Sequence, residues 1–370
     1  MEFAIIKADL VRELNLSQGV VEKKTTIPIL SNVLIEAEGD RIVLTATDLE
    51  LSVRCSAPAK VKKSGSGTIP AKKLLDYVRL LPDGEINIKF ADNQWASINC
   101  GRSKTRIAGM SRESFPELPV MPEVLAEIPV KTLAQMISKT IFAISQEESR
   151  FTLNGALLIV RADGMVMVST DSHRLALVEQ RVALGNLKAP YRALLPRKAM
   201  NEILKLAADA ADDAKLMFSG DDNHLFFSLG ERLLISRKLT GNFPEFERVL
   251  PKEHPQVVTM DRDEFKGALE RVMQFADERS RAIKLTTSAG EFKLHSSLSE
   301  TGESEETMGV SYDGPAVQIG FNGQYIIDFL RAISETEVAF HFKDGSAAGE
   351  LRPGGDPTYT YRYIVMPMRI

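Results

Sequence analysis

Apolar residues recur at helical spacing at six places along the chain. Pairs that lie four residues apart occur at three of them: Leu10 and Leu14, Leu133 and Ile137, and Phe265 and Leu269. A second helix is predicted farther along from each of three further apolar sets: Leu74, Val78 and Leu81; Met200, Ile203 and Leu204; and Ile326, Phe329, Leu330 and Ile333. This spacing places the residues on one face of an α-helix.

Strand-like alternation separates the two predicted helices of each set. Ile42 and Leu44 alternate with polar neighbours, as Met165 and Met167 alternate in the later stretch MVMVSTD, and Gly-Asp or Asp-Gly turns punctuate these runs. Antiparallel strands joined by tight turns have this pattern. Two helices packed on antiparallel sheet, three times over, predict an α+β fold rather than a parallel α/β fold.

The same sequence pattern returns along the chain. Residues 31–48 match residues 154–171, so that Thr47 and Asp48 fall on Thr170 and Asp171, and a weaker third copy starts near Arg281. The stretch FPELP from Phe115 returns as FPEFERVLP. A fixed period of this length indicates a tandem repeat. With prolines clustered at the seams, we predict three domains at residues 1–121, 128–250 and 251–370.

Composition limits the classes of function. The 370 residues carry a net charge of −4, which argues against a large, uniformly basic surface. Neither the two cysteines nor the five histidines show metal-ligand spacing, so we expect no metal and no cofactor. The start of the chain lacks a secretory apolar region, and no stretch approaches the roughly 18 apolar residues of a membrane span. We therefore expect a cytoplasmic protein with no membrane partner.

The sequence lacks the common catalytic motifs. The sequence has no GxxxxGK[ST] phosphate loop and no GxGxxG after a strand. Ser169, Asp171 and His173 suggest a hydrolase, but neighbours in one strand and turn point in different directions and do not form a catalytic line. The sequence therefore indicates a binding or scaffolding protein rather than an enzyme.

Four features together resemble one family over the whole length of the chain. These are the triplication, the TDxxRLA element at Thr170–Ala176, FPEFERVLP and the terminal VMPMR. They are similar to the bacterial DNA polymerase III beta subunits, the sliding clamps. The resemblance implies three tandem clamp domains of the DNA clamp fold, and a head-to-tail homodimer that closes as a ring around double-stranded DNA. It also implies a non-catalytic role in replication, in which the clamp tethers the polymerase and confers processivity.

Charge at two segments predicts how a ring would close. Residues 101–107 form an alternating strand with cations on one side, and residues 299–306 are acidic. Exposed edge strands invite pairing, and opposite charges select the partner. The residues expected at the dimer interface are Arg102, Lys104, Arg106, Ile107, Glu300, Glu303, Glu305 and Glu306.

Cations on the predicted helices are the candidates for contact with DNA. An encircling protein can remain acidic outside, because the ring itself prevents dissociation, and loose phosphate contacts permit sliding. The residues expected to face DNA are Lys24, Lys72, Lys73, Arg79, Lys131, Lys139, Arg197, Lys198 and Lys205.

The chain ends in the almost wholly apolar stretch YRYIVMPMRI. We expect Ile364 to complete a core, and Met366 and Met368 to belong to a peptide pocket, because methionine adapts to several apolar partners. The resemblance implies such a pocket for a glutamine-plus-leucine/phenylalanine motif of the polymerase alpha subunit, the clamp loader, other polymerases and repair proteins. Its expected residues are Arg150, Leu153, Thr170, His173, Arg174, Leu175, Pro244, Arg248, Val249, Asn322, Tyr325, Val365, Met366, Pro367, Met368 and Arg369.

Two positions depart from the family pattern. Ser172 stands where the family often has glycine, and Ile370 stands where leucine is common. Two alternatives remain open at this point. One is a triplicated scaffold or carbohydrate-type binding protein with no role on DNA. The other is the hydrolase that uses Ser169, Asp171 or His173.

Overall fold

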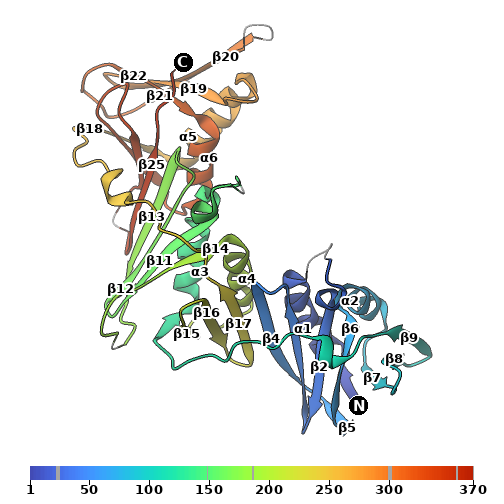
Figure 1. Ribbon diagram of the computed structural model, residues 1–370. Coiled ribbons are helices and arrows are strands. Elements are labelled where there is room, and N and C mark those ends of the chain that lie inside the picture. The colour runs from blue at the N-terminus through green and yellow to red at the C-terminus, as the bar shows by residue number, and fades with distance from the viewer. Residues whose placement is uncertain (22–25, 148, 186, 299–301, 356, 370) are drawn as a thin grey trace. The chain divides into compact units, whose positions relative to one another are not determined.

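The computed structural model describes residues 1–21, 26–147, 149–185, 187–298, 302–355 and 357–369 (Figure 1). The chain groups into two compact units. Unit 1 comprises Met1–Ala134 and Lys198–Lys238, and unit 2 comprises Gln135–Arg197 and Leu239–Ile370. The described residues form helices and antiparallel sheets, as predicted.

Six α-helices lie within the described residues, at the places that the apolar spacing predicts. The first helix of each repeat is α1 (Lys7–Val20), α3 (Val130–Ser138) or α5 (Arg262–Val272), and the second is α2 (Ala71–Leu80), α4 (Arg197–Ala208) or α6 (Gly323–Ala332). Leu81 and Ile333 lie just beyond their helices and are nevertheless buried. The sequence therefore predicted every one of these helices.

Unit 1 contains two antiparallel sheets. The order of the smaller sheet is β5 (Lys60–Lys63), β1 (Glu2–Ile6), β7 (Glu85–Phe90), β8 (Trp95–Cys100) and β9 (Ser103–Ala108). The order of the larger sheet is β10 (Ala126–Pro129), β15 (Lys215–Gly220), β16 (His224–Leu229), β17 (Arg232–Arg237), β4 (Leu51–Pro58), β3 (Arg41–Thr47), β2 (Asn32–Glu38) and β6 (Gly65–Pro70).

Unit 2 repeats this arrangement. The order of its larger sheet is β14 (Tyr191–Pro196), β11 (Gly155–Arg161), β12 (Gly164–Thr170), β13 (Arg174–Arg181), β25 (Thr360–Val365), β24 (Gly349–Pro353), β23 (Glu337–Phe342) and β18 (Gln256–Asp261). The order of its smaller sheet is β21 (Gly302–Gly309), β20 (Glu291–Leu298), β19 (Ala282–Ser288) and β22 (Val317–Asn322).

The core of unit 1 joins its helices to both sheets. Leu10 and Leu14 of α1 pack in one cluster with Leu74 and Val78 of α2, and the cluster includes inward-facing residues from both sheets. At about 25 cal/mol per Å² of apolar surface removed from water, this burial is the main force that holds the repeat together. Cys55 and Cys100 are buried and free, and burial raises the pKa of the Cys55 thiol.

Each larger sheet joins strands from two successive repeats. In unit 1, β4 pairs with β17, which we call the first seam, and in unit 2, β13 pairs with β25, which we call the second seam. Pairings between strands so distant in sequence leave no local pattern, so the sequence did not predict them. The domain bounds 1–121, 128–250 and 251–370 stay a prediction.

One turn has the same geometry beside both seams. At the first, Asp48 Oδ1 accepts from the backbone N–H groups of Glu50 (2.9 Å) and Leu51 (2.6 Å). At the second, Asp171 Oδ1 accepts from His173 (3.0 Å) and Arg174 (3.1 Å). The residue that follows the aspartate, Leu49 at the first turn and Ser172 at the second, has φ of 77° in each case. The sequence repeat thus extends to individual hydrogen bonds.

Candidate functional site

The turn between β12 and β13 carries the residues of the TDxxRLA element. Thr170 Oγ1 accepts from the N–H of Ser172 (3.1 Å) and donates to the carbonyl of Arg174 (2.6 Å). Ser172 adopts a left-handed backbone, a conformation that favours glycine, but its hydroxyl accepts from Arg150 at 2.9 Å. Arg150 also donates to the carbonyl of Asp171. The serine thus gains a contact that glycine lacks.

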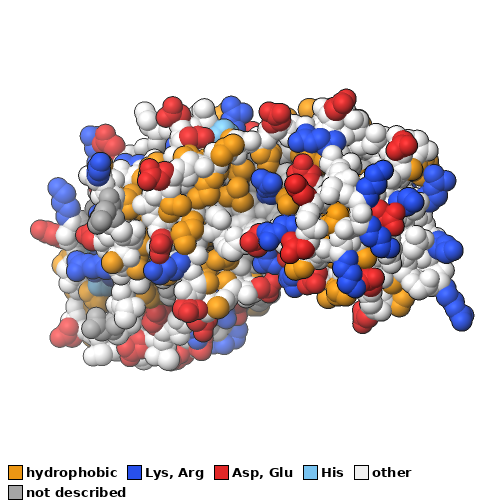
Figure 2. All heavy atoms as spheres, turned by 90° about the horizontal axis from the view of Figure 1, so that it is seen from below, with side chains coloured by type: hydrophobic (Ala, Val, Ile, Leu, Met, Phe, Trp, Pro, Cys, Tyr) orange, Lys and Arg blue, Asp and Glu red, His pale blue; other side chains and the backbone are white. Residues whose placement is uncertain are grey.

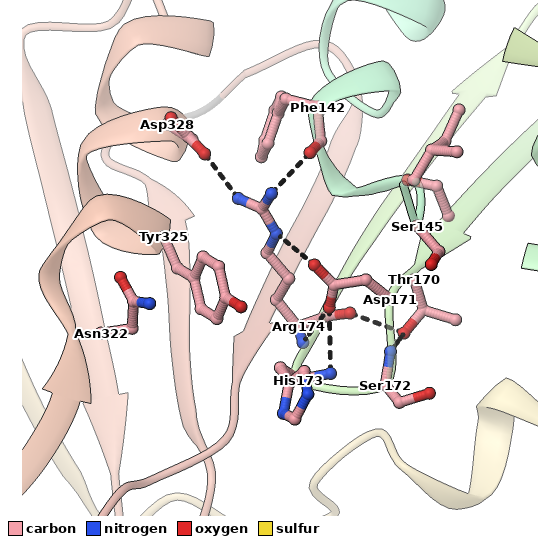
Figure 3. Close-up of polar contacts among 12 residues, drawn as sticks. Phe142, Ser145, Thr170, Asp171, Ser172, His173, Arg174, Asn322, Tyr325 and Asp328 are labelled. Atoms are coloured by element: carbon pink, nitrogen blue, oxygen red, sulfur yellow. Dashed lines mark hydrogen bonds and ion pairs between the residues drawn. The ribbon is translucent and has the colours of Figure 1, made fainter. Parts of the chain in front are cut away.

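Arg174 connects this turn to α6, as Figure 3 shows. Its Nε donates to Asp171 Oδ2 (3.0 Å), its Nη1 to Asp328 Oδ2 (2.6 Å) and its Nη2 to the carbonyl of Phe142 (2.6 Å). The guanidinium carbon also lies 4.3 Å from the ring centroid of Tyr325. Burial by itself lowers the pKa of Arg174, but Tyr363 and Asp328 raise it above its ordinary value. Arg174 is therefore a structural connector whose charge is fully engaged.

The tail leaves β25 and runs beside the turn. Ile364 and Val365 are buried, whereas Met366, Pro367 and Met368 are half-buried and Arg369 is exposed. The N–H of Met366 donates to the carbonyl of His173 (2.9 Å), and the N–H of Met368 donates to Gly320 (2.8 Å). The predicted role of Ile364 in the core is confirmed. The backbone bonds hold the methionines at the surface of unit 2.

The start of α6 and the segment after residue 239 complete the same surface. Asn322 caps α6 by accepting from the N–H of Gln324 (2.9 Å), and the half-buried Tyr325 follows one turn later. Phe243, Phe246 and Leu250 pack on a cluster that contains Leu175 and Ile364. Pro244, Arg248 and Val249 lie in this segment, with Pro244 and Arg248 exposed.

The structure therefore divides the predicted pocket residues into two groups. The accessible group is Arg150, His173, Pro244, Arg248, Val249, Asn322, Tyr325, Met366, Pro367, Met368 and Arg369. We call it the docking surface, after the role that the resemblance implies and that stays a prediction. The other group has side chains that are less than a tenth exposed and supports this surface from below: Leu153, Thr170, Arg174, Leu175 and Val365. The sequence could not separate the two groups, because burial depends on distant segments.

The hydrolase alternative fails on geometry. Ser169 is fully buried, and its hydroxyl donates to the carbonyl of Thr140 at 2.5 Å. Asp171 is occupied by the turn and by Arg174, while His173 is exposed. A serine nucleophile requires a hydrogen-bonded base and access to substrate, and Ser169 has neither. Among the described residues, no cluster of His, Cys, Asp or Glu is arranged to hold a metal ion.

The two charged segments predicted at the dimer interface are edge strands. β9 ends the smaller sheet of unit 1, with Lys104 and Arg106 exposed, and β21 ends the smaller sheet of unit 2, with Glu303 and Glu305 exposed. Arg102 is exposed in the turn before β9. Each edge therefore presents one sign of charge along a strand whose outer side pairs with no described strand.

Three of the predicted interface residues are not seen among the exposed side chains of the charged edges. Ile107 is 4% exposed and belongs to the core of unit 1, so its side chain is not available for contact, and its expected place at the interface stays a prediction. Glu306 points to the other face of β21, where both its carboxylate oxygens accept from Arg271 at 2.7 and 2.8 Å. Glu300 lies outside the described residues. The alternation along a strand explains Glu306, because successive side chains face opposite sides.

The predicted DNA-facing cations differ in what they contact. Lys72 and Lys73 are exposed on α2. The others have internal partners: Arg79 contacts Asn15, Lys131 the carbonyl of Ala207, Arg197 the carbonyls of Ile141 and Ile144, Lys198 the carboxylate of Asp48, and Lys205 the carboxylate of Glu202. Lys24 lies outside the described residues. Lys72 and Lys73 thus remain the most available candidates.

Lys139 does not lie on the surface, where a DNA contact would require it. Its side chain is buried, its ammonium lies 4.6 Å from the ring centroid of Tyr359, and it donates to the carbonyl of Ala332 at 3.2 Å. Burial lowers its pKa. A cation held in this way cannot reach a phosphate, so its predicted DNA contact is wrong.

Figure 2 shows basic and acidic side chains interspersed over one face of the molecule.

Family models cover nearly the whole chain. Residues 1–119 match the N-terminal domain of the DNA polymerase III beta subunit, residues 127–245 its central domain and residues 247–369 its C-terminal domain. The chain belongs to the DNA polymerase III beta-subunit family. It therefore has three clamp domains and is a non-catalytic processivity subunit, a sliding clamp, as the sequence predicted. This excludes the alternative of a scaffold with no role on DNA.

Individual relatives agree over full length. The beta sliding clamp of Pseudomonas putida is 34% identical, with all of both chains covered. A crystal structure of the DNA polymerase III beta subunit from Pseudomonas aeruginosa is 32% identical, covers all of both chains and has a TM-score of 0.93. A structure from the same organism bound to griselimycin is 32% identical, also over the whole of both chains, with a TM-score of 0.94.

Sequence reasoning missed two residues that contact predicted site residues. Asp328, the partner of Arg174, is the one acidic residue within the mainly apolar helix GQYIIDFLRA. A single acidic residue in such a helix could have indicated that it has a charged partner. Trp95, the single tryptophan, lies beside Arg106, whose guanidinium carbon is 5.1 Å from the ring centroid. Among the described residues, no helix has the length and apolar character that a membrane span requires.

Proposed function

We propose that two copies of this chain close head to tail into a ring around duplex DNA. The observation that carries the proposal is the pair of oppositely charged edge strands, β9 with Lys104 and Arg106, and β21 with Glu303 and Glu305. A strand with an unpaired edge can extend its ladder with another chain. Two such contacts per dimer leave neither edge free. Two β9 strands would not pair with each other, because both are positively charged.

The ring replaces affinity for DNA by topology. The net charge of −4 and the scarcity of unpaired cations on the predicted DNA-facing helices suit weak, sequence-independent contact. Lys72 and Lys73 would touch phosphates transiently, which permits sliding. A polymerase held by such a ring rebinds its primer end at high effective concentration instead of diffusing away. The location in which this function is carried out would be the cytoplasm.

The docking surface would hold the polymerase and other partners. Met366, Met368, Pro244 and Val249 offer apolar contact, Tyr325 and His173 offer polar tips, and Arg174 fixes the turn to α6. A peptide with glutamine followed by leucine and phenylalanine would supply the complementary groups. The griselimycin complex of the Pseudomonas aeruginosa relative supports this proposal, since it is a clamp that binds a ligand.

Retention on closed DNA tests the function. The chain is loaded on a nicked circular plasmid with its clamp loader and ATP, and the DNA is isolated by gel filtration. We expect the chain to stay with the circle and to be lost when a restriction enzyme linearises it. Equal retention on circular and linear DNA would contradict encirclement, because binding to phosphates does not depend on free ends.

A further inference from the structure

The two seams have the same backbone hydrogen bonds but different side chains on their outer faces. At the second seam the N–H of Met366 donates to the carbonyl of His173 (2.9 Å), and at the first the N–H of Arg237 donates to the carbonyl of Glu50 (2.7 Å). Together with the two matching turns, this identifies corresponding positions in the two units. The second seam carries the docking surface. The first seam therefore has the same backbone framework as the docking surface, but it has no assigned role.

Strand register shows what differs. Leu34 opposes Thr45, and Thr45 opposes Arg54; at the second seam Leu157 opposes Val168, and Val168 opposes Leu177. The second seam thus has apolar side chains where the first has threonine and arginine. Glu36 likewise replaces Ile159, and Ser52 replaces Leu175. The outer face of the first seam is polar where that of the second is an apolar cluster.

This exchange leaves the face of unit 1 hollow. A cavity of about 310 Å³ is lined by Leu34, Glu36, Thr45, Arg54, Arg112 and residues 115–118. A second cavity of about 410 Å³ also includes Arg54, together with Val43, Ser56, Gly230 and Leu233. Arg54 lines both, so this cation lies between the two hollows, and we call the two together the groove. At the second seam, Phe243, Phe246 and Leu250 cover the corresponding face.

The charge of Arg54 has no counterpart within the described chain. Its guanidinium is exposed and makes no hydrogen bond or ion pair to a described residue. The other cations of the groove are neutralised. Arg41 donates to Glu231 at 3.0 Å, Arg112 lies 3.9 Å from Glu36, and Arg232 donates to Glu13 at 2.8 Å. A planar guanidinium binds a carboxylate through two parallel hydrogen bonds. Arg54 is thus a built position for one carboxylate.

We propose that the first seam is a second docking groove, which takes an extended peptide with an acidic residue between two apolar residues. The carboxylate binds Arg54, and the apolar side chains enter the two hollows, against the half-buried Pro116 and Leu118 on one side and Val43 and Leu233 on the other. A chain of phosphates would have to pass Glu36, Glu117 and Glu231, which line the same cavities, whereas the peptide brings a single carboxylate, at Arg54. Nucleic acid is therefore disfavoured. A free inorganic anion would leave the apolar walls uncovered.

The geometry of an extended chain specifies the probe. Alternate side chains of a strand point to one side, so the labelled peptide Leu-Ser-Glu-Ser-Leu presents its glutamate and both leucines together. The comparison peptide has glutamine in place of glutamate, and a labelled oligothymidylate tests for nucleic acid. Binding to the full chain is followed by fluorescence anisotropy. The groove does not depend on ring closure, so its variants should keep DNA retention unchanged.

Arg54→Ala is expected to weaken binding of the glutamate peptide at least tenfold, and Arg54→Lys to weaken it less. The matched control is Arg192→Ala, which removes an exposed arginine from β14 in the other unit and should change nothing. The glutamine peptide should bind the unaltered chain at least fivefold more weakly than the glutamate peptide. Equal binding of the two peptides, no effect of Arg54→Ala, or Arg54-dependent binding of oligothymidylate alone would each overturn the proposal.

Discussion

The guanidinium of Arg174 lies 2.6 Å from the carboxylate of Asp328, and this ion pair joins the TDxxRLA turn of the second repeat to the helix of the third. Arg174 is 9% exposed and Asp328 is 22% exposed. The pair is therefore largely withdrawn from water, and its geometry fixes the turn that carries His173. The docking surface depends on this contact although neither charge is free to bind a partner.

Removing Asp328 should destabilise the chain. Asp328→Ala leaves the buried guanidinium of Arg174 short of one partner, which is expected to lower the free energy of unfolding by about 2 to 3 kcal/mol. The matched control is Glu270→Ala, which breaks the exposed pair of Glu270 with Arg331 and should cost at most about 1 kcal/mol. Urea unfolding measures both, and equal effects would show that the Arg174 contact is dispensable.

Stability should fall on acidification in two stages. Burial lowers the pKa of His341 to about 4, so below its ordinary value of 6.5 the unfolded chain binds a proton that the folded chain does not. Burial raises the pKa of Glu350, but hydrogen bonds from Arg362 and Arg352 lower it to about 2. The contribution of Glu350 is therefore present above pH 4.5 and lost as the pH falls toward 2.

The first stage can be separated from the second by mutation. We expect the urea midpoint to drop between pH 6.5 and pH 5, and His341→Gln to reduce that drop, because glutamine does not titrate. From pH 7 to pH 8 His341 is largely neutral in both states, which provides a baseline. An unaltered midpoint between pH 6.5 and pH 5 would mean that His341 titrates normally in the folded chain.

The methionines of the tail should carry peptide binding. Met366→Ala and Met368→Ala remove half-buried apolar contact from the docking surface, and each should weaken a synthetic peptide with glutamine, leucine and phenylalanine about fivefold to tenfold. Arg54→Ala, at the other seam, is the control and should leave this peptide unaffected. Calorimetry measures the affinities. Full binding by both methionine variants would place the peptide elsewhere.

Trp95 should report on association. It is 40% exposed and lies beside Arg106, next to the edge strand β9. Pairing of β9 with another chain would remove this tryptophan from water, so a variant unable to pair should emit at longer wavelength. Glu303→Lys with Glu305→Lys provides such a variant without touching the tryptophan's own surroundings. Identical emission spectra would indicate that β9 stays exposed in solution.

The sequence predicted what depends on local pattern. Leu10 and Leu14 predicted α1, and the match of Thr47-Asp48 with Thr170-Asp171 predicted a repeat that the structure extends to single hydrogen bonds. Long-range features escaped it. Lys139 is buried because Tyr359 and Tyr361, more than 200 residues later, enclose its ammonium. No local spacing encodes such a contact, and the same holds for the partnership of Arg174 with Asp328.

A charge exchange across the edge strands tests ring closure most directly. Lys104→Glu with Arg106→Glu reverses β9, and Glu303→Lys with Glu305→Lys reverses β21. Each variant alone should be monomeric by native mass spectrometry, because both contacts of its dimer then join like charges. Mixed together, the two variants should form a heterodimer in which both contacts again join opposite charges. Dimers of either variant alone, or no heterodimer in the mixture, would contradict the closed ring.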